Sequence, residues 1–353
     1  MQEKMSSSNP LNVASFSLAS ILCLLGPGPL ELSAGDEAGQ IRVIPYPELK
    51  VRLNGTDPLP RERTWQRLEQ DGIADAAAYV MSNQRSDARR RRMDHYRQQT
   101  LVIEWDGAPG ARWAFNVEGS LSSLPTGDVR LPPRGWKRFR WERDGDQKCK
   151  LIYENDDPEA SLHVEFQAKQ DHVDYSLTVQ ANDAQTRDQV ATHVCFNHSW
   201  ADGFGRDALV LTDGRIRRLG DIPNPQRIWI RVATLADDPT HADLKRQQFN
   251  HEGIGSNLSD KRLTGPDAEK IKVPAGNVQG RFIATQRAGD GAATVAINSP
   301  NAISVGWSFW PCTDIDLAFD TVRPREPKTV SGRIWFLKEG IDKAVNTVRI
   351  GAN

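Results

Sequence analysis

The sequence predicts an all-β protein, a large antiparallel β-sandwich with one or two short helices near the N-terminus. Apolar and polar residues alternate with period two in about eleven runs from residue 100 onward, as expected of half-buried strands. Apolar residues at helical spacing are confined to residues 61–97. Because sandwiches often exceed about 200 residues in one unit, we expect a single domain over residues 40–350.

The first 40 residues differ from the rest of the chain. The apolar run 13–25 has the length of the hydrophobic region of a signal peptide and is too short to span a bilayer. Residues 32–34 (Leu-Ser-Ala) offer a small-residue cleavage site. We therefore expect residues 1–34 to be a signal peptide and the protein to be secreted or located in the periplasm or cell envelope. A disordered or anchoring tail is the alternative.

The predicted elements follow in order along the chain. Residues 61–97 are a helical or loop insertion, and residues 237–278, rich in glycine and polar residues, form a long surface loop. The runs 161–168 and 173–179, joined by a short polar segment, predict an antiparallel hairpin. Further strands are predicted at 100–106, 112–118, 191–197, 208–218, 227–233, 280–286, 292–297, 303–309 and 329–337.

Charge and cysteine content exclude several classes of function. The chain has 45 basic and 46 acidic side chains and a formal net charge of -1, so it lacks the field of a nucleic-acid-binding protein. The run Arg89-Arg90-Arg91-Arg92 is either a solvated helix end or a site for an acidic polysaccharide.

Beyond the leader, Cys149, Cys195 and Cys312 are far apart and form no CxxC motif. We expect no cofactor, no metal and at most one disulfide.

The most informative segment is 191–202. In a strand, His193, Cys195 and Asn197 share one face, and Val194 and Phe196 share the other. His193 and His198 are an odd number of residues apart, so a regular strand does not let them bind one metal together. His193 is therefore either a structural histidine or part of a site.

Two further clusters are candidate sites. In segment 134–142, Trp136, Arg138 and Arg140 would share one strand face, which suits a sugar or a carboxylated sugar; the alternative is an exposed strand. Segment 305–316 is predicted to leave a strand and enter a turn that carries Asp314 and Asp316. These carboxylates would act as a base, bind a cation or cap the turn.

The ten tryptophans are more than a core of this size usually needs. We expect Trp136 or Trp200 to line a polar, concave face of the sheet. Four others are in apolar strand contexts and are expected in the core: Trp105, Trp113, Trp229 and Trp335.

Residues 192–197 resemble the H-x-Y-F-N strand of the galactose mutarotase (aldose 1-epimerase) superfamily, and residues 134–138 with Trp141 are similar to its upstream H-G-F-A-R…W segment. The order and rough spacing of the two segments agree. The resemblance implies an antiparallel β-supersandwich over about 100–340 and a sugar ligand. It also extends to exported bacterial proteins of this type.

The resemblance further implies that His193 is the general acid of a sugar-ring opening, with a glutamate near the C-terminus as base. Arg134 stands where the family has a second histidine, and Asp314 or Asp316 lies near the expected base on a shorter side chain. We therefore expect carbohydrate recognition without catalysis, for a mono- or polysaccharide. The expected ligand-binding residues are Arg134, Trp136, Arg138, Asn197, His198 and Trp200.

Two alternatives stay open. The first is an aldose epimerase or polysaccharide lyase, with His193 as acid and Asp314 or Asp316 as base. The second is a structural cell-envelope sandwich without a small-molecule site.

Overall fold

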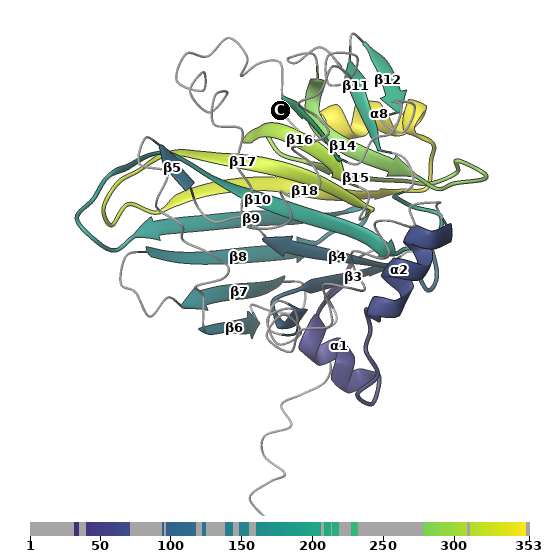
Figure 1. Ribbon diagram of the computed structural model, residues 1–353, viewed down its shortest axis with the longest axis horizontal. Coiled ribbons are helices and arrows are strands. Elements are labelled where there is room, and N and C mark those ends of the chain that lie inside the picture. Colours follow the sequence, from purple (N-terminus) through teal and green to yellow (C-terminus); the bar gives the residue numbers. More distant parts are fainter. Residues whose placement is uncertain are drawn as a thin grey trace, which may run out of the picture.

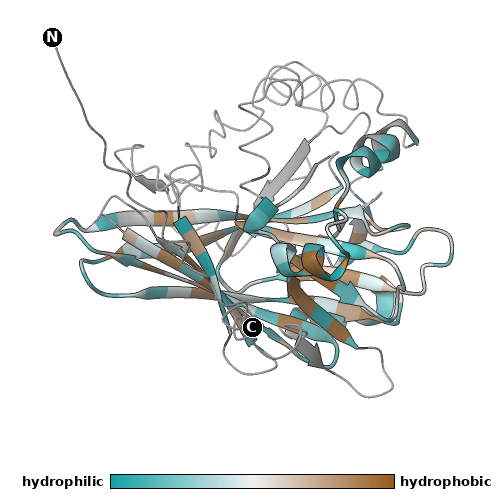
Figure 2. Ribbon diagram, turned by 90° about the horizontal axis from the view of Figure 1, so that it is seen from below, coloured by the Kyte–Doolittle hydropathy of each residue, from teal (hydrophilic) through white to brown (hydrophobic). Residues whose placement is uncertain are grey.

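The computed structural model shows two antiparallel β-sheets that pack face to face, which confirms the predicted all-β class. It describes residues 32–34, 40–70, 94, 97–117, 122–124, 138–143, 148–154, 160–205, 208–212, 214–218, 227–231, 278–308 and 311–350. Figure 2 shows the sheets as two layers seen from the side, with hydrophobic residues along the strands.

The first sheet has its strands in the spatial order β1 (Leu32–Ala34), β2 (Ile41–Pro45), β3 (Leu101–Trp105), β4 (Arg112–Val117), β10 (Arg187–Trp200), β17 (Cys312–Val322), β16 (Ala302–Ser308) and β13 (Arg227–Arg231). The short strand β5 (Ser122–Leu124) also pairs with β10. The long strands β10 and β17 therefore lie at the centre of this sheet.

The second sheet has the order β12 (Arg215–Arg218), β11 (Leu209–Thr212), β14 (Val278–Gln286), β15 (Thr294–Asn298), β18 (Lys328–Leu337), β9 (His172–Ala181), β8 (Ala160–Ala168), β7 (Lys148–Glu154) and β6 (Arg138–Arg143). The predicted hairpin is confirmed as β8 and β9, in which alternate residues are buried. Its turn is closed by the Lys169 N–H, which donates to the His172 carbonyl at 2.8 Å.

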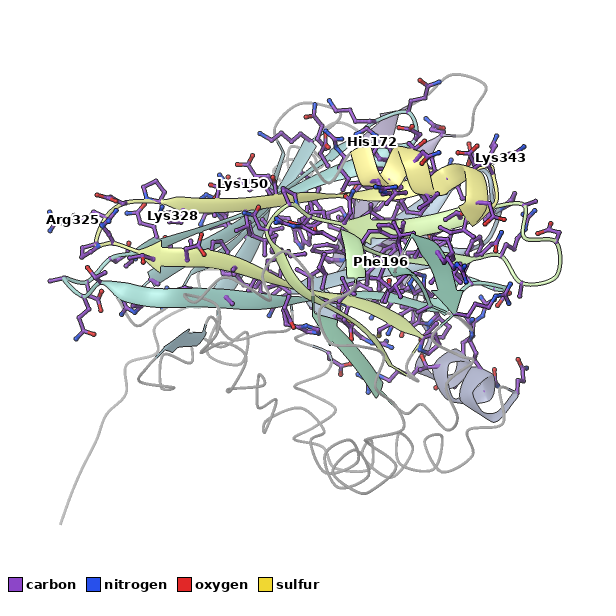
Figure 3. The ribbon with its side chains drawn as sticks, turned by 90° about the horizontal axis from the view of Figure 1, so that it is seen from above. Lys150, His172, Phe196, Arg325, Lys328 and Lys343 are labelled. Carbon is purple, nitrogen blue, oxygen red and sulfur yellow. The ribbon has the colours of Figure 1, made fainter. Side chains whose placement is uncertain are left out.

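The main core lies between the two sheets. Phe196, labelled in Figure 3, lies between the layers and contacts Phe336 of the opposite sheet with ring centroids 6.4 Å apart. Trp105 and Trp113 contact the same Phe336 ring, at 5.7 and 5.1 Å. Trp105, Trp113 and Trp335 are buried as predicted, whereas the side chain of Trp229 lies outside the described residues.

Three helices cover parts of the sheets in the described part of the chain: α1 (Tyr46–Arg52), α2 (Arg61–Gln70) and α8 (Ile341–Ile350). Tyr46 and Leu49 of α1 pack with Val102, Ala114 and Trp200 on the face of the first sheet turned away from the main core. Helix α2 lies within the segment predicted to be helical. No helix among the described residues is long and apolar enough to cross a membrane.

Helix α8 packs through an apolar stripe on the outer face of the second sheet. Ile341, Ala344 and Val348 are buried against a cluster that includes Phe282 and Trp335. Their spacing of three and four residues places them on one side of the helix. The helix is also tied to β15, because the Asn298 side-chain amide donates to the Val348 carbonyl at 2.7 Å.

We expect Val348→Ala to lower the free energy of unfolding by about 2 kcal/mol, because two buried methyl groups are removed. Asn346 is exposed on the same helix, so Asn346→Ala is the control and should change stability by less than about 0.5 kcal/mol. Urea unfolding followed by circular dichroism measures both. Equal effects of the two substitutions would contradict the packing of α8.

The turn predicted in segment 305–316 is wrong, and helices α1 and α8 lie outside residues 61–97, where helical spacing was expected. Residues 312–316 were expected in a turn, but they begin the eleven-residue strand β17, and every residue from Cys312 to Phe319 is buried. The strand lies between β10 and β16, so both of its edges are hydrogen-bonded. Asp314 and Asp316 are therefore residues of a central strand and do not cap a turn.

Other predicted segments lie largely outside the described residues. These are residues 1–31 of the expected signal peptide, the arginine run 89–92 and the loop 237–278 except for Val278. Residues 32–34 form β1, which pairs with β2.

Candidate functional site

A row of polar side chains crosses the centre of the first sheet on the face turned away from the main core. Val194 and Phe196 of β10 belong to the core. Because side chains alternate along a strand, His193, Cys195 and Asn197 point to the other face, as predicted. The register pairs them, in that order, with Asp316, Asp314 and Cys312 of β17. We call these six residues the polar face.

His193 lies between the two carboxylates of the polar face. Its Nδ1 atom is 2.9 Å from Asp316 Oδ1, and its Nε2 atom is 3.9 Å from Asp314 Oδ2. All three side chains are no more than 4% exposed. A carboxylate on Nδ1 holds the imidazole in one orientation and favours a proton on that nitrogen. The Nε2 atom is thereby directed toward Asp314.

The other half of the polar face contains sulfur. Cys195 Sγ lies 3.2 Å from Cys312 Sγ, and the Asn197 side-chain amide donates to Cys312 Sγ at 3.2 Å. Both cysteines are buried. Together with a carboxylate oxygen of Asp314, the two sulfur atoms form a group in which all the ligand atoms lie within 4.8 Å of one another.

The polar face extends to the neighbouring strand β4. Asn116 pairs with Cys195 across the sheet and is 7% exposed. Its Oδ1 atom accepts a hydrogen bond from the Thr100 hydroxyl at 2.6 Å. The centre of the sheet therefore carries a carboxylate, imidazole, thiol and amide arrangement that spans three adjacent strands.

His198 lies apart from the polar face. It is completely buried, its Nε2 atom is 2.8 Å from Thr313 Oγ1, and its ring meets Phe196 edge-on at 4.9 Å. Burial, together with the positive charge of Arg67, lowers the pKa of His198 to about 3. His198 is therefore a neutral core histidine, and it does not share a face with His193, as the odd spacing predicted.

Trp200 does not line a polar surface, and Trp136, the other residue named in that expectation, lies outside the described residues. Trp200 is 9% exposed and packs in the apolar cluster beneath α1. Its indole N–H donates to the Pro60 carbonyl at 3.0 Å. A register shift between Asn197 and Trp200 separates it from the alternation of β10. Its polar atom is thus used to hold the helical segment to the sheet.

Arg138 is on the other sheet from His193. It lies on the edge strand β6 and is exposed, while the neighbouring Phe139 and Trp141 pack against the main core. The Trp141 indole N–H donates to the Gln98 carbonyl at 3.1 Å. Because Arg138 and His193 both point away from the core on opposite sheets, they do not form one site. Arg134 and Trp136 lie outside the described residues.

No sequence motif predicts that Cys195, Cys312 and Asp314 lie close together. Cys195 and Cys312 are 117 residues apart and neither belongs to a CxxC motif. The one available signal was alternation itself, which places Cys312, Asp314 and Asp316 on one face if that segment is a strand.

Comparisons with known proteins give remote structural matches. No family model matches the chain, and no curated protein matches it. A protein from Synechocystis sp. PCC 6803 aligns at 8% identity and a TM-score of 0.43 over 89% of this chain and 97% of its own. A galactose mutarotase related enzyme from Lactobacillus acidophilus aligns at 10% identity and a TM-score of 0.38 over 70% of this chain and 93% of its own.

An α-N-acetylgalactosaminidase from Bifidobacterium bifidum also aligns, at 11% identity and a TM-score of 0.40, over 70% of this chain and 34% of its own. The matches include proteins named for the superfamily that the two sequence segments resemble. At these TM-scores the similarity bears on neither substrate nor activity.

Proposed function

We propose that this protein is a secreted or cell-envelope carbohydrate-binding protein that holds a sugar on the polar face of β10 and β17. The observation that carries the proposal is the position of His193 between Asp314 and Asp316. The resemblance of residues 192–197 to a sugar-binding strand supports it. The near-zero net charge is consistent with a neutral or weakly charged ligand.

The spacing of His193 and Asp314 fits one sugar hydroxyl bound between them. His193 Nε2 and Asp314 Oδ2 are 3.9 Å apart, so one oxygen atom at about 2.8 Å from each makes a hydrogen bond to both. A sugar hydroxyl has one hydrogen, so it can donate to the Asp314 carboxylate and accept from His193 Nε2 when that nitrogen carries a proton. Asn197 adds an amide that can bind a neighbouring hydroxyl, and it is the one partly exposed residue of the polar face.

A second candidate function is an aldose epimerase or polysaccharide lyase, which the same histidine and carboxylates favour. An acid and a base in such reactions act on different atoms of the substrate, and each must reach its own atom within about 3 Å. A separation of 3.9 Å leaves room for one shared oxygen between His193 and Asp314. Binding is therefore the better supported function.

We expect His193→Ala to weaken glycan binding by about 10- to 100-fold, because a hydrogen bond to a charged partner contributes roughly 1.5–3 kcal/mol. Asp316→Asn should weaken binding less, since it disturbs only the orientation of the imidazole. His163→Ala is the matched control, because His163 is a partly buried histidine on β8 of the other sheet. A glycan array followed by titration with Trp fluorescence measures all three.

Three results separate the candidates. Binding that His193→Ala does not change would contradict the proposed site. Turnover of fresh aldoses by polarimetry, or of uronate polymers by absorbance, would favour the enzyme. If the folded wild type binds neither neutral nor acidic glycans, a structural sandwich is favoured.

A further inference from the structure

The sulfur half of the polar face has the composition of a metal site. Cys195, Cys312 and Asp314 present two thiols and a carboxylate whose ligand atoms all lie within 4.8 Å of one another, and all three are buried. Thiolates select zinc and similar thiophilic ions over magnesium and calcium. Acidic clusters of exposed side chains are common on proteins, but this group is buried and combines sulfur with oxygen.

We infer that Cys195, Cys312 and Asp314 bind one thiophilic divalent ion of the zinc class. With Zn–S bonds of about 2.3 Å and tetrahedral angles, two sulfur ligands lie about 3.8 Å apart. The sulfur atoms here are 3.2 Å apart, so small side-chain rotations bring them to that separation. The inference concerns the metal alone and does not depend on a sugar ligand.

Neighbouring side chains contact the proposed metal ligands and hold them in place, as hydrogen-bond partners of the ligands do in other metal sites. The Asn197 amide donates to Cys312 Sγ at 3.2 Å, a contact that stabilises a thiolate. The His193 Nε2 atom lies 3.9 Å from Oδ2 of the ligand Asp314, and Asp316 orients the ring through Nδ1. Three protein ligands leave a fourth position for an oxygen ligand.

The register argues against a disulfide as the alternative use of these thiols. Cys195 pairs with Asp314 and Cys312 pairs with Asn197, so the two cysteines are diagonal neighbours. Diagonal residues of an antiparallel pair have Cα atoms about 7–8 Å apart, whereas a disulfide usually joins residues whose Cα atoms are about 4.4–6.8 Å apart. An ion bound between the two sulfur atoms can link cysteines whose backbones are farther apart than a disulfide allows, without a shift of the strands.

The test is the zinc content of the full chain, purified in reducing buffer, equilibrated with Zn²⁺ and freed of excess metal. We expect about one zinc ion per chain. Cys195→Ala and Cys312→Ala should each lower the bound zinc at least tenfold. Cys149→Ala is the matched control, because Cys149 is a buried thiol of β7 in the main core. It should bind zinc as the wild type does, and circular dichroism checks that each variant folds.

A second measurement needs no variant. Wild-type protein loaded with Co²⁺ should show a thiolate-to-cobalt charge-transfer band whose intensity corresponds to two thiolates. A folded wild type without bound zinc and without this band would overturn the inference. So would zinc retained by folded Cys195→Ala and Cys312→Ala, or a loss of two titratable thiols from the wild type isolated without reductant, which indicates a disulfide.

Discussion

Arg67→Met is expected to lower the free energy of unfolding by about 3–5 kcal/mol, because removing a buried charged donor leaves its buried acceptors without a partner. The Arg67 guanidinium is buried and donates to three backbone carbonyls at the end of β10. These belong to His198 at 2.6 Å, Ala201 at 3.0 Å and Phe204. The side chain thus holds helix α2 to the segment that follows the polar face.

Arg63→Met on the same helix is the control. Arg63 is paired with Asp202, but the two side chains are 39% and 79% exposed, so this ion pair contributes less than about 1 kcal/mol. Chemical unfolding at neutral pH compares the two variants. A loss of stability in Arg67→Met no greater than that in Arg63→Met would contradict the role of the buried guanidinium.

The second large effect is a loss of stability in acid caused by His198. Because its pKa is about 3 in the folded protein and about 6.5 in an unfolded chain, the unfolded state binds more protons between these values. Stability from this group is therefore complete above about pH 6.5 and falls as the pH falls toward 3. The expected loss is about 2 kcal/mol at pH 5 and about 3 kcal/mol at pH 4.

Urea unfolding of the wild type and His198→Gln at pH 7, 6, 5 and 4 measures this effect. By pH 5 the variant should have lost about 2 kcal/mol less than the wild type, and by pH 4 about 3 kcal/mol less. His172→Gln is a control of opposite sign. Burial lowers the pKa of His172, but hydrogen bonds to Asp171 and Asp174 outweigh it and the net shift is upward.

A raised pKa means that His172 contributes stability that is complete below about pH 6.5 and is lost as the pH rises through its folded pKa. His172→Gln should therefore steepen the loss of stability in acid, whereas His198→Gln reduces it. Parallel pH profiles of the wild type and His198→Gln would show that the buried histidine does not cause the acid effect.

Much of the fold could be predicted from local pattern. The hairpin of β8 and β9 was visible because apolar and polar residues alternate without interruption on both sides of a short polar segment. Strand β17 was missed because Pro311 and two aspartates indicate a turn more strongly than a central strand. The sequence does alternate between polar and apolar residues at Asp314, Ile315 and Asp316. Only the burial of this segment between β10 and β16 shows that the alternation belongs to a strand.

The candidate site, too, could be predicted only in part from local sequence pattern. The common face of His193, Cys195 and Asn197 follows from the geometry of one strand. The contact of His193 with Asp316, 123 residues later, requires the register of β10 against β17, which no local pattern specifies. The placement of Arg138 on the opposite sheet likewise depends on the order of strands in space.

The sequence by itself determined the antiparallel class, the faces of individual strands and the residues able to carry chemistry, because side-chain alternation and turn composition are local properties. Only the tertiary structure decided which of these residues meet. Hydrogen bonding between distant strands brings His193 to Asp314 and Asp316 and Cys195 to Cys312. Packing against Phe196 of the main core takes His198 away from them, and packing beneath α1 takes Trp200 away. Contacts between strands form over long sequence separations, and their energies depend on the complete packing of both sheets.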